Sequence, residues 1–69
     1  MANVKAKMLR DHDPEAKALG GWYARIEYLT PRGTMAAETD YCRTREGAVI
    51  AALALAFRLG LPLTATREN

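Results

Sequence analysis

The feature that most constrains this 69-residue chain is a stretch in which every side chain from Ala48 to Phe57 is apolar. Thr44 is suited to cap a helix that contains this stretch, and Gly60 followed by Pro62 is suited to end it. The sequence therefore predicts a helix over about Arg45–Leu59. A helix that is apolar all round needs cover on more than one side, yet a chain this short forms one small domain with little core.

Placing the residues at intervals of about 100° around this helix gives two apolar faces. One face carries mostly large side chains, and it is expected to pack on a sheet: Val49, Ile50, Leu53 and Phe57. The opposite face mixes small and large side chains, and it is the candidate partner or dimer interface: Ala48, Ala51, Ala52, Leu55 and Leu59. Three covers for it remain open: the chain's own first segment or tail at Leu61–Leu63, a second copy, or a different protein.

Upstream of the helix, alternating side chains predict three strands. Apolar and polar residues alternate in residues 3–8 and again in residues 22–28, and a return strand is expected over about Thr34–Tyr41. Between the first two strands, Asp13 and Pro14 are suited to begin a single helical turn. The predicted fold class is α+β, with a three-stranded antiparallel sheet packed against one main helix. Residues 1–69 form one domain, with a flexible tail from about Thr64.

The register of the last two strands is expected to follow from the side chains that share the apolar face of the sheet. These are expected to include Met35, Ala37, Thr39 and Tyr41. This arrangement puts Tyr28 opposite Ala37 and leaves a four-residue loop, Pro31–Thr34. A two-residue primed turn is excluded in this interpretation, because proline cannot adopt a positive φ.

Residues with catalytic or metal-binding potential are few. His12 and Cys42 are the single histidine and the single cysteine of the chain. The segment Asp11-His12-Asp13 lacks the converging donors that a metal site needs, so a solvated capping loop is the expectation there. Cys42 is expected to fill the junction between strand and helix as a small apolar side chain. We predict no catalytic residue, no metal and no cofactor, and expect that the protein is not an enzyme.

The charge balance is mild, with a formal net charge of +2. It permits nucleic acid as a partner without requiring it. The candidate contacts to a partner or to phosphates are Tyr23, Arg25, Arg32, Arg43 and Arg45. Acidic residues are interspersed with them, so a solvated face of mixed charge is the alternative.

The pattern of apolar residues also bears on where the protein works. No apolar stretch reaches the length of a transmembrane helix. The first ten positions include three basic residues and lack the apolar core of a signal peptide: Lys5, Lys7 and Arg10. These observations predict a cytoplasmic protein without a membrane partner. Because alanine supplies 13 of the 69 residues and buries little area, a homodimer is expected.

The run Trp22–Tyr28, the segment Ala37–Thr39 and the alanine-rich helix from Thr44 together resemble two groups of proteins. One is the double-stranded-RNA-binding domain, whose last hairpin and helix have this layout. That family has a cluster of lysines where this chain has Arg43–Gly47, with two basic residues, one acid and a glycine. It also has a long N-terminal helix that this sequence lacks.

The second group is the small phage and prophage accessory proteins, some of which are anti-CRISPR or other anti-defence inhibitors. There, a hairpin leads through a junction similar to Asp40-Tyr41-Cys42 into an alanine-rich helix. This resemblance implies a non-enzymatic phage protein that binds and inhibits a host defence protein or ribonucleoprotein complex in the host cytoplasm. The alternatives are nucleic-acid binding through Arg25, Arg32, Arg43 and Arg45, and a structural subunit of a phage or bacterial assembly.

Overall fold

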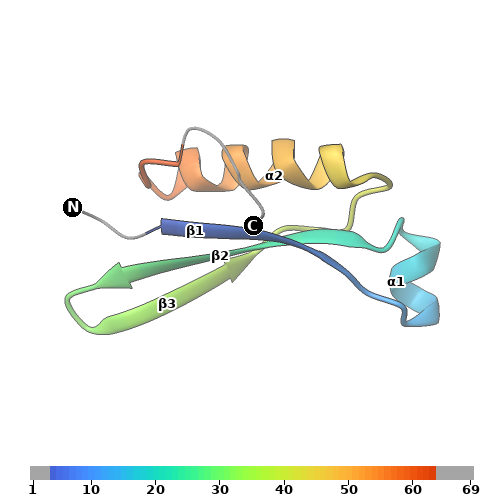
Figure 1. The fold of residues 1–69 in the computed structure, drawn as a ribbon, viewed down its shortest axis with the longest axis horizontal. Coiled ribbons are helices and arrows are strands. Elements are labelled where there is room, and N and C mark those ends of the chain that lie inside the picture. Colours follow the sequence, from blue (N-terminus) through green and yellow to red (C-terminus); the bar gives the residue numbers. More distant parts are fainter. Residues whose placement is uncertain (1–3, 64–69) are drawn as a thin grey trace.

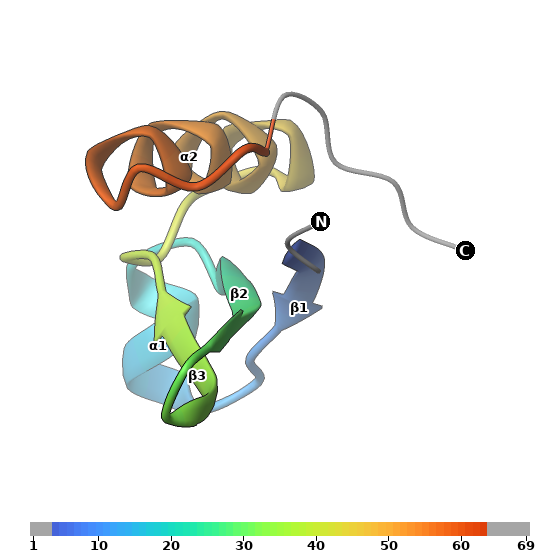
Figure 2. The same cartoon turned by 90° about the vertical axis from the view of Figure 1, so that its left-hand side faces the viewer.

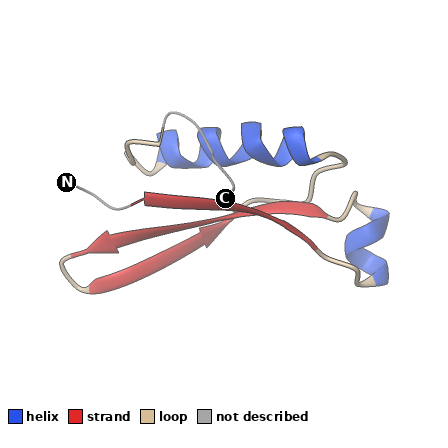
Figure 3. Cartoon of the chain, in the orientation of Figure 1, coloured by secondary structure: helices blue, strands red, loops and turns tan. Residues whose placement is uncertain are grey.

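The computed structural model describes residues 4–63 and contains two helices and three strands (Figure 1). In chain order the elements are β1 (Val4–Arg10), α1 (Pro14–Ala18), β2 (Trp22–Thr30), β3 (Gly33–Glu38) and α2 (Arg45–Arg58). The strands form an antiparallel sheet in the order β1-β2-β3, and α2 covers one face of it (Figure 3). The predicted α+β architecture is confirmed. The tail expected from about Thr64 lies outside the described residues.

The alternation seen in the sequence sets the two faces of the sheet. Met8, Ala24 and Ile26 are almost completely buried between the sheet and α2. Their neighbours along the strands, among them Arg25 and Glu27, point to the opposite face and are exposed. One face of the sheet is therefore the core, and the other is a solvated surface with charges of both signs.

The hairpin between β2 and β3 differs from the expectation. Tyr28 pairs with Met35 rather than Ala37, and Thr30 pairs with Gly33, so the loop has two residues instead of four. The positive φ of +116° falls on Gly33, and Pro31 keeps a negative φ. The four-residue loop was predicted because a two-residue loop was assumed to need a primed turn, which Pro31 excludes. This two-residue loop instead places the positive φ on Gly33, the glycine that follows it.

A second difference lies at the end of β3, which stops at Glu38 and not at Tyr41. The pairing of Arg25 with Glu38, if continued, would set Trp22 opposite Tyr41. Trp22 instead exchanges two backbone hydrogen bonds with Cys42. One extra residue is therefore inserted as a bulge, and it turns Tyr41 away from the α2 side of the sheet, where the sequence had placed it.

The ends of α2 follow local capping rules. The Thr44 hydroxyl accepts a hydrogen bond of 2.9 Å from the backbone N–H of Gly47 at the start of the helix. At the other end Gly60 has a φ of +70°, and the Leu61 N–H donates to the carbonyl of Ala56. This is a Schellman ending, and it confirms the predicted helix to within one residue.

The face of α2 that packs on the sheet is the opposite of the predicted one. Ala48, Ala52 and Ala56 are fully buried, while Ile50 and Phe57 are exposed. Small side chains let the helix axis approach the sheet closely, and this close contact outweighs the larger apolar area that the other face would bury. The sequence had predicted that Val49, Ile50, Leu53 and Phe57 pack on the sheet. This prediction is wrong for Ile50 and Phe57, which are exposed.

The short helix α1 and the glycines after it connect β1 to β2. Asp13 caps α1 by accepting a 2.9 Å hydrogen bond from the Glu15 N–H, with Pro14 in the first turn, as the sequence predicted. After α1 the backbone of Gly20 lies so close to the Cys42 carbonyl that a Cβ atom at this position would clash with it. The two loops at this end of the molecule are thus packed backbone against backbone.

Candidate functional site

The most prominent surface feature is the side of α2 that points away from the sheet. Phe57 is 85% exposed and Ile50 is 68% exposed, although both are large and apolar. Leu53 and Ala54 lie between them on the same side, at spacings of three and four residues. We call Ile50, Leu53, Ala54 and Phe57 the outer face of α2. It forms an apolar ridge, and its two large ends lie about 10 Å apart along the helix.

Charged side chains border this ridge and do not interrupt it. Glu46 lies in the first turn of α2 and Arg58 in the last, and both are exposed. The negative charge of Glu46 at the N-terminus and the positive charge of Arg58 at the C-terminus each interact favourably with the helix dipole, so both stabilise α2 in the free protein. The outer face is therefore apolar over its length and polar at its ends, which is the usual arrangement of a protein-binding surface.

The structure corrects the interface predicted from the sequence. Ala48 and Ala52 are fully buried against the sheet, and Leu55 packs against the core from the flank. In this fold the two alanines have no surface to offer to a partner. Ala51 is half-buried, and Leu59, the C-cap residue, is 43% exposed. The helix does have a second, uncovered apolar side, but it consists of other residues.

The four arginines that were candidate phosphate contacts do not form one patch. Arg25 lies on the outer side of the sheet, where its guanidinium pairs with Glu27 at 3.3 Å and with Glu38 at 3.4 Å. Arg32 lies in the hairpin turn, whereas Arg43 and Arg45 lie at the start of α2. These two places are at opposite ends of the molecule (Figure 1). A phosphate backbone would therefore meet a distributed set of charges, one of them already paired with acids.

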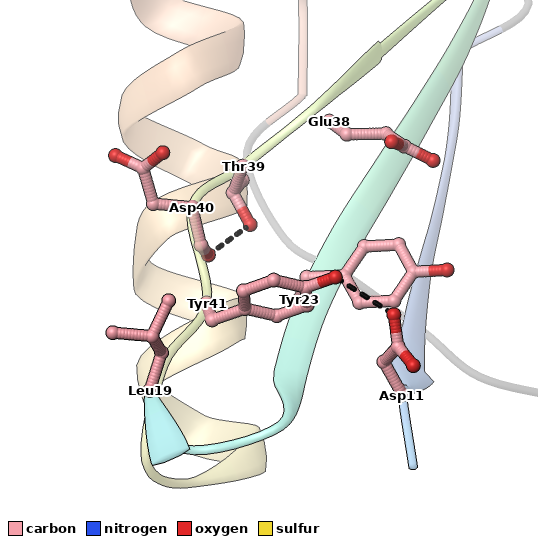
Figure 4. A pocket seen from close by; sticks show the side chains of 7 residues that line it. All are labelled: Asp11, Leu19, Tyr23, Glu38, Thr39, Asp40 and Tyr41. Atoms are coloured by element: carbon pink, nitrogen blue, oxygen red, sulfur yellow. Dashed lines mark hydrogen bonds between the residues drawn. The ribbon is translucent and has the colours of Figure 1, made fainter. Parts of the chain in front are cut away.

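A hollow of about 540 Å³ lies at the end of the sheet where β3 leads toward α2 (Figure 4). Tyr23, another predicted contact, lines it, and its ring meets the ring of Tyr41 edge to face, with centroids 5.6 Å apart. The remaining lining residues are Asp11, Leu19, Glu38, Thr39 and Asp40.

Within this hollow, the Tyr41 hydroxyl donates a 2.7 Å hydrogen bond to the Asp11 carboxylate. The backbone N–H of Asp13 donates to the same carboxylate, and these two bonds lower the pKa of Asp11 below its ordinary value. The bond to Asp11 raises the pKa of Tyr41 to about 12. The pair connects the loop after β1 to the loop before α2, and both functional groups are already used in that connection.

Cys42 lies half-buried at the junction that precedes α2 and packs against the core, which confirms the role expected for it. In the part of the chain that the structure describes, no three histidine, cysteine, aspartate or glutamate side chains gather as metal ligands would. Neither α1 nor α2 has both the length and the apolar character that crossing a bilayer demands. Comparison with protein-family models, curated proteins and solved structures finds no match to this chain.

Proposed function

We propose that this chain is a non-enzymatic binding protein that inserts the outer face of α2 into an apolar groove of a larger protein. The observation that carries the proposal is the 85% exposure of Phe57 on a helix whose opposite side consists of buried alanines. Apolar residues spaced i, i+3, i+4 and i+7 are the arrangement by which a helix binds in a groove. Ile50, Leu53, Ala54 and Phe57 have this spacing.

The energetics identify the two residues that matter most. Complete burial of Phe57 or Ile50 at an interface contributes about 1.5–3 kcal/mol each. Leu53 is already half-buried in the free protein and Ala54 is small, so both contribute less. Phe57 and Ile50 are therefore the expected hot spots, and the charged residues at the ends of the ridge determine specificity more than affinity.

The identity of the larger partner rests on the sequence resemblance to phage accessory proteins. That resemblance supports a host defence complex of the CRISPR type, either a protein or a ribonucleoprotein. Inhibition by occlusion requires only that the bound helix block a working surface of the complex, so it needs no catalytic group from this chain. Direct binding of nucleic acid has less support, because the four arginines lie on different parts of the surface.

The proposal is tested by expressing the chain in cells that carry a CRISPR-type interference system and by counting the plaques of a targeted phage. Wild-type protein should restore plaque formation, and the double variant Ile50→Gln/Phe57→Gln should not. Leu29→Gln is the matched control, because Leu29 is also large, apolar and 58% exposed but lies on β2. Failure of the wild type would refute the defence target. Equal loss in the double variant and the control would refute the outer face of α2 as the binding site.

A further inference from the structure

The free edge of β3 lies apart from the outer face of α2. The order β1-β2-β3 leaves one side of β3 without a paired strand within residues 4–63, and Figure 2 shows β3 at one margin of the sheet. Five of its six residues are exposed. Lysine and proline are among the devices by which natural edge strands discourage pairing with another strand. β1 carries Lys5 and Lys7, whereas β3, with the sequence GTMAAE, carries neither residue type.

The hydrogen-bonding pattern shows which backbone groups of β3 are free to pair. The N–H of Thr39 points toward β2, because it donates to the carbonyl of Ala24. Backbone groups alternate in direction along an antiparallel strand, so those of Ala37 and Met35 also point toward β2. The backbone N–H and C=O groups that point away from the sheet are those of Thr34, Ala36 and Glu38.

We propose that β3 pairs antiparallel with β3 of a second copy of this chain, with the two Ala36 residues opposite each other. In this register each Thr34 lies opposite Glu38 of the second copy. The backbone N–H and C=O groups that point away from β2 can therefore form hydrogen bonds between the two strands along their whole length. On the α2 side of the sheet, Met35 of one copy lies beside Ala37 of the other, a large side chain next to a small one. Met35 is 50% exposed in the single chain, and the second copy would cover it.

Charge complementarity favours the same arrangement. Arg32 precedes β3, and Asp40 follows it. In the proposed pairing the turn that holds Arg32 in one copy lies beside the segment after β3 that holds Asp40 in the other, and the twofold symmetry brings these opposite charges near each other twice. Antiparallel pairing of two β1 edges around Ala6 would instead set Lys5 against Lys7 of the second copy. Like charges directly opposite each other destabilise a strand pair, so the β3 edge is the one suited to self-association.

The dimer leaves the outer face of α2 open. Pairing of two edge strands about a twofold axis perpendicular to the sheet keeps both α2 helices on the same side of one six-stranded sheet. α2 packs mainly on β2 and also on β1, away from the β3 edge. The inference is therefore independent of the proposed function. If the dimer and the proposed function both hold, the dimer presents two copies of the outer face of α2, and a partner with two grooves binds it with higher avidity.

The test is sedimentation equilibrium of the wild type and of Ala36→Pro over a range of micromolar concentrations. Proline removes the Ala36 N–H, which points away from β2, and an outward-facing edge position tolerates proline within the protomer. Two main-chain hydrogen bonds are lost per dimer, so the dissociation constant should rise by about tenfold or more. Ala36→Val is the control, because it keeps the N–H, and it should dimerise like the wild type.

A charge reversal tests the register without proline. Arg32→Asp and Asp40→Arg should each weaken the dimer, and the two together should restore it. A wild type that stays monomeric overturns the proposal, and so does a dimer that Ala36→Pro leaves intact but Phe57→Gln dissociates. If Ala36→Pro unfolds the protomer, the charge-reversal series decides. Absence of restoration in the double variant then counts against the pairing.

Discussion

The orientation of α2 on the sheet can be tested by two substitutions, of which one should destabilise the fold and the other should leave its stability almost unchanged. Ala52 is fully buried between the helix and the sheet, and Phe57 is 85% exposed on the other side. Enlarging the first residue, as in Ala52→Leu, forces new atoms into a filled contact. Replacing the second, as in Phe57→Gln, removes a side chain that has most of its surface in water.

The magnitudes follow from these exposures. Overpacking at a filled position costs about 1–3 kcal/mol of unfolding free energy, so Ala52→Leu should destabilise the protein by that amount. The buried part of Phe57 is the remaining 15%. Burying this fraction of the side chain stabilises the fold by about 0.2–0.5 kcal/mol, which is the free energy lost in Phe57→Gln. Glutamine recovers part of it because it is the better helix former. We expect Phe57→Gln to change stability very little.

The assay is thermal and urea unfolding followed by far-ultraviolet circular dichroism, at a protein concentration low enough that dimerisation does not contribute. For a domain of this size, each kcal/mol corresponds to a shift in Tm of about 4–8 °C, so Ala52→Leu should be clearly resolved. The reverse result, a loss of about 3 kcal/mol or more in Phe57→Gln with Ala52→Leu near neutral, would mean that the large residues face the sheet. It would refute the arrangement described above.

Other expectations concern the loops. Gly20→Ala should strongly destabilise the protein in urea unfolding, because the new Cβ would clash with the Cys42 carbonyl. A Cβ at Gly60 has open space, so Gly60→Ala should show only the milder cost of its φ of +70°. Tyr41→Phe should raise the pKa of Asp11 toward its ordinary value, which an NMR titration of the carboxyl group would detect. The stability that the wild-type bond adds should be present near neutral pH. It should decline as the pH falls below 3.8, because Asp11 takes up a proton, and as the pH rises from 10 to about 12, because Tyr41 loses one. The difference in unfolding free energy between the wild type and Tyr41→Phe, measured as a function of pH, checks that the stabilisation declines at both the acidic and the alkaline end.

Local rules explain which parts of the fold the sequence predicts well. Thr44 and Gly60 define the ends of α2 because capping depends on a few neighbouring atoms. Alternation defines β1 and β2 because one face of each strand is buried. The hairpin register is less determined, since a shift of two residues keeps every side chain on the same face. The bulge that turns Tyr41 outward has no comparable signal in the sequence.

The candidate site shows a different limit. Both faces of α2 are apolar in sequence, so composition indicates that one face is left uncovered but does not identify it. The choice depends on how closely the helix approaches the sheet, which is a property of tertiary packing. The alanines at positions 48, 52 and 56 were the available signal, because an unbroken row of small residues at four-residue spacing favours close contact. Assigning the larger side chains to the core by default led to the wrong face.

The alanine row beneath α2 has a consequence for how this protein can change over time. The side chains that fix the helix in place and those that we propose bind a partner point in opposite directions, so in this proposal affinity and folding depend on separate sets of residues. A target that reshaped its groove could be matched by exchanging Ile50 or Phe57 for side chains of another shape, with the scaffold unaffected. Adaptation should therefore be fast on one side of the helix and slow on the other, where each added methyl group strains the contact between helix and sheet.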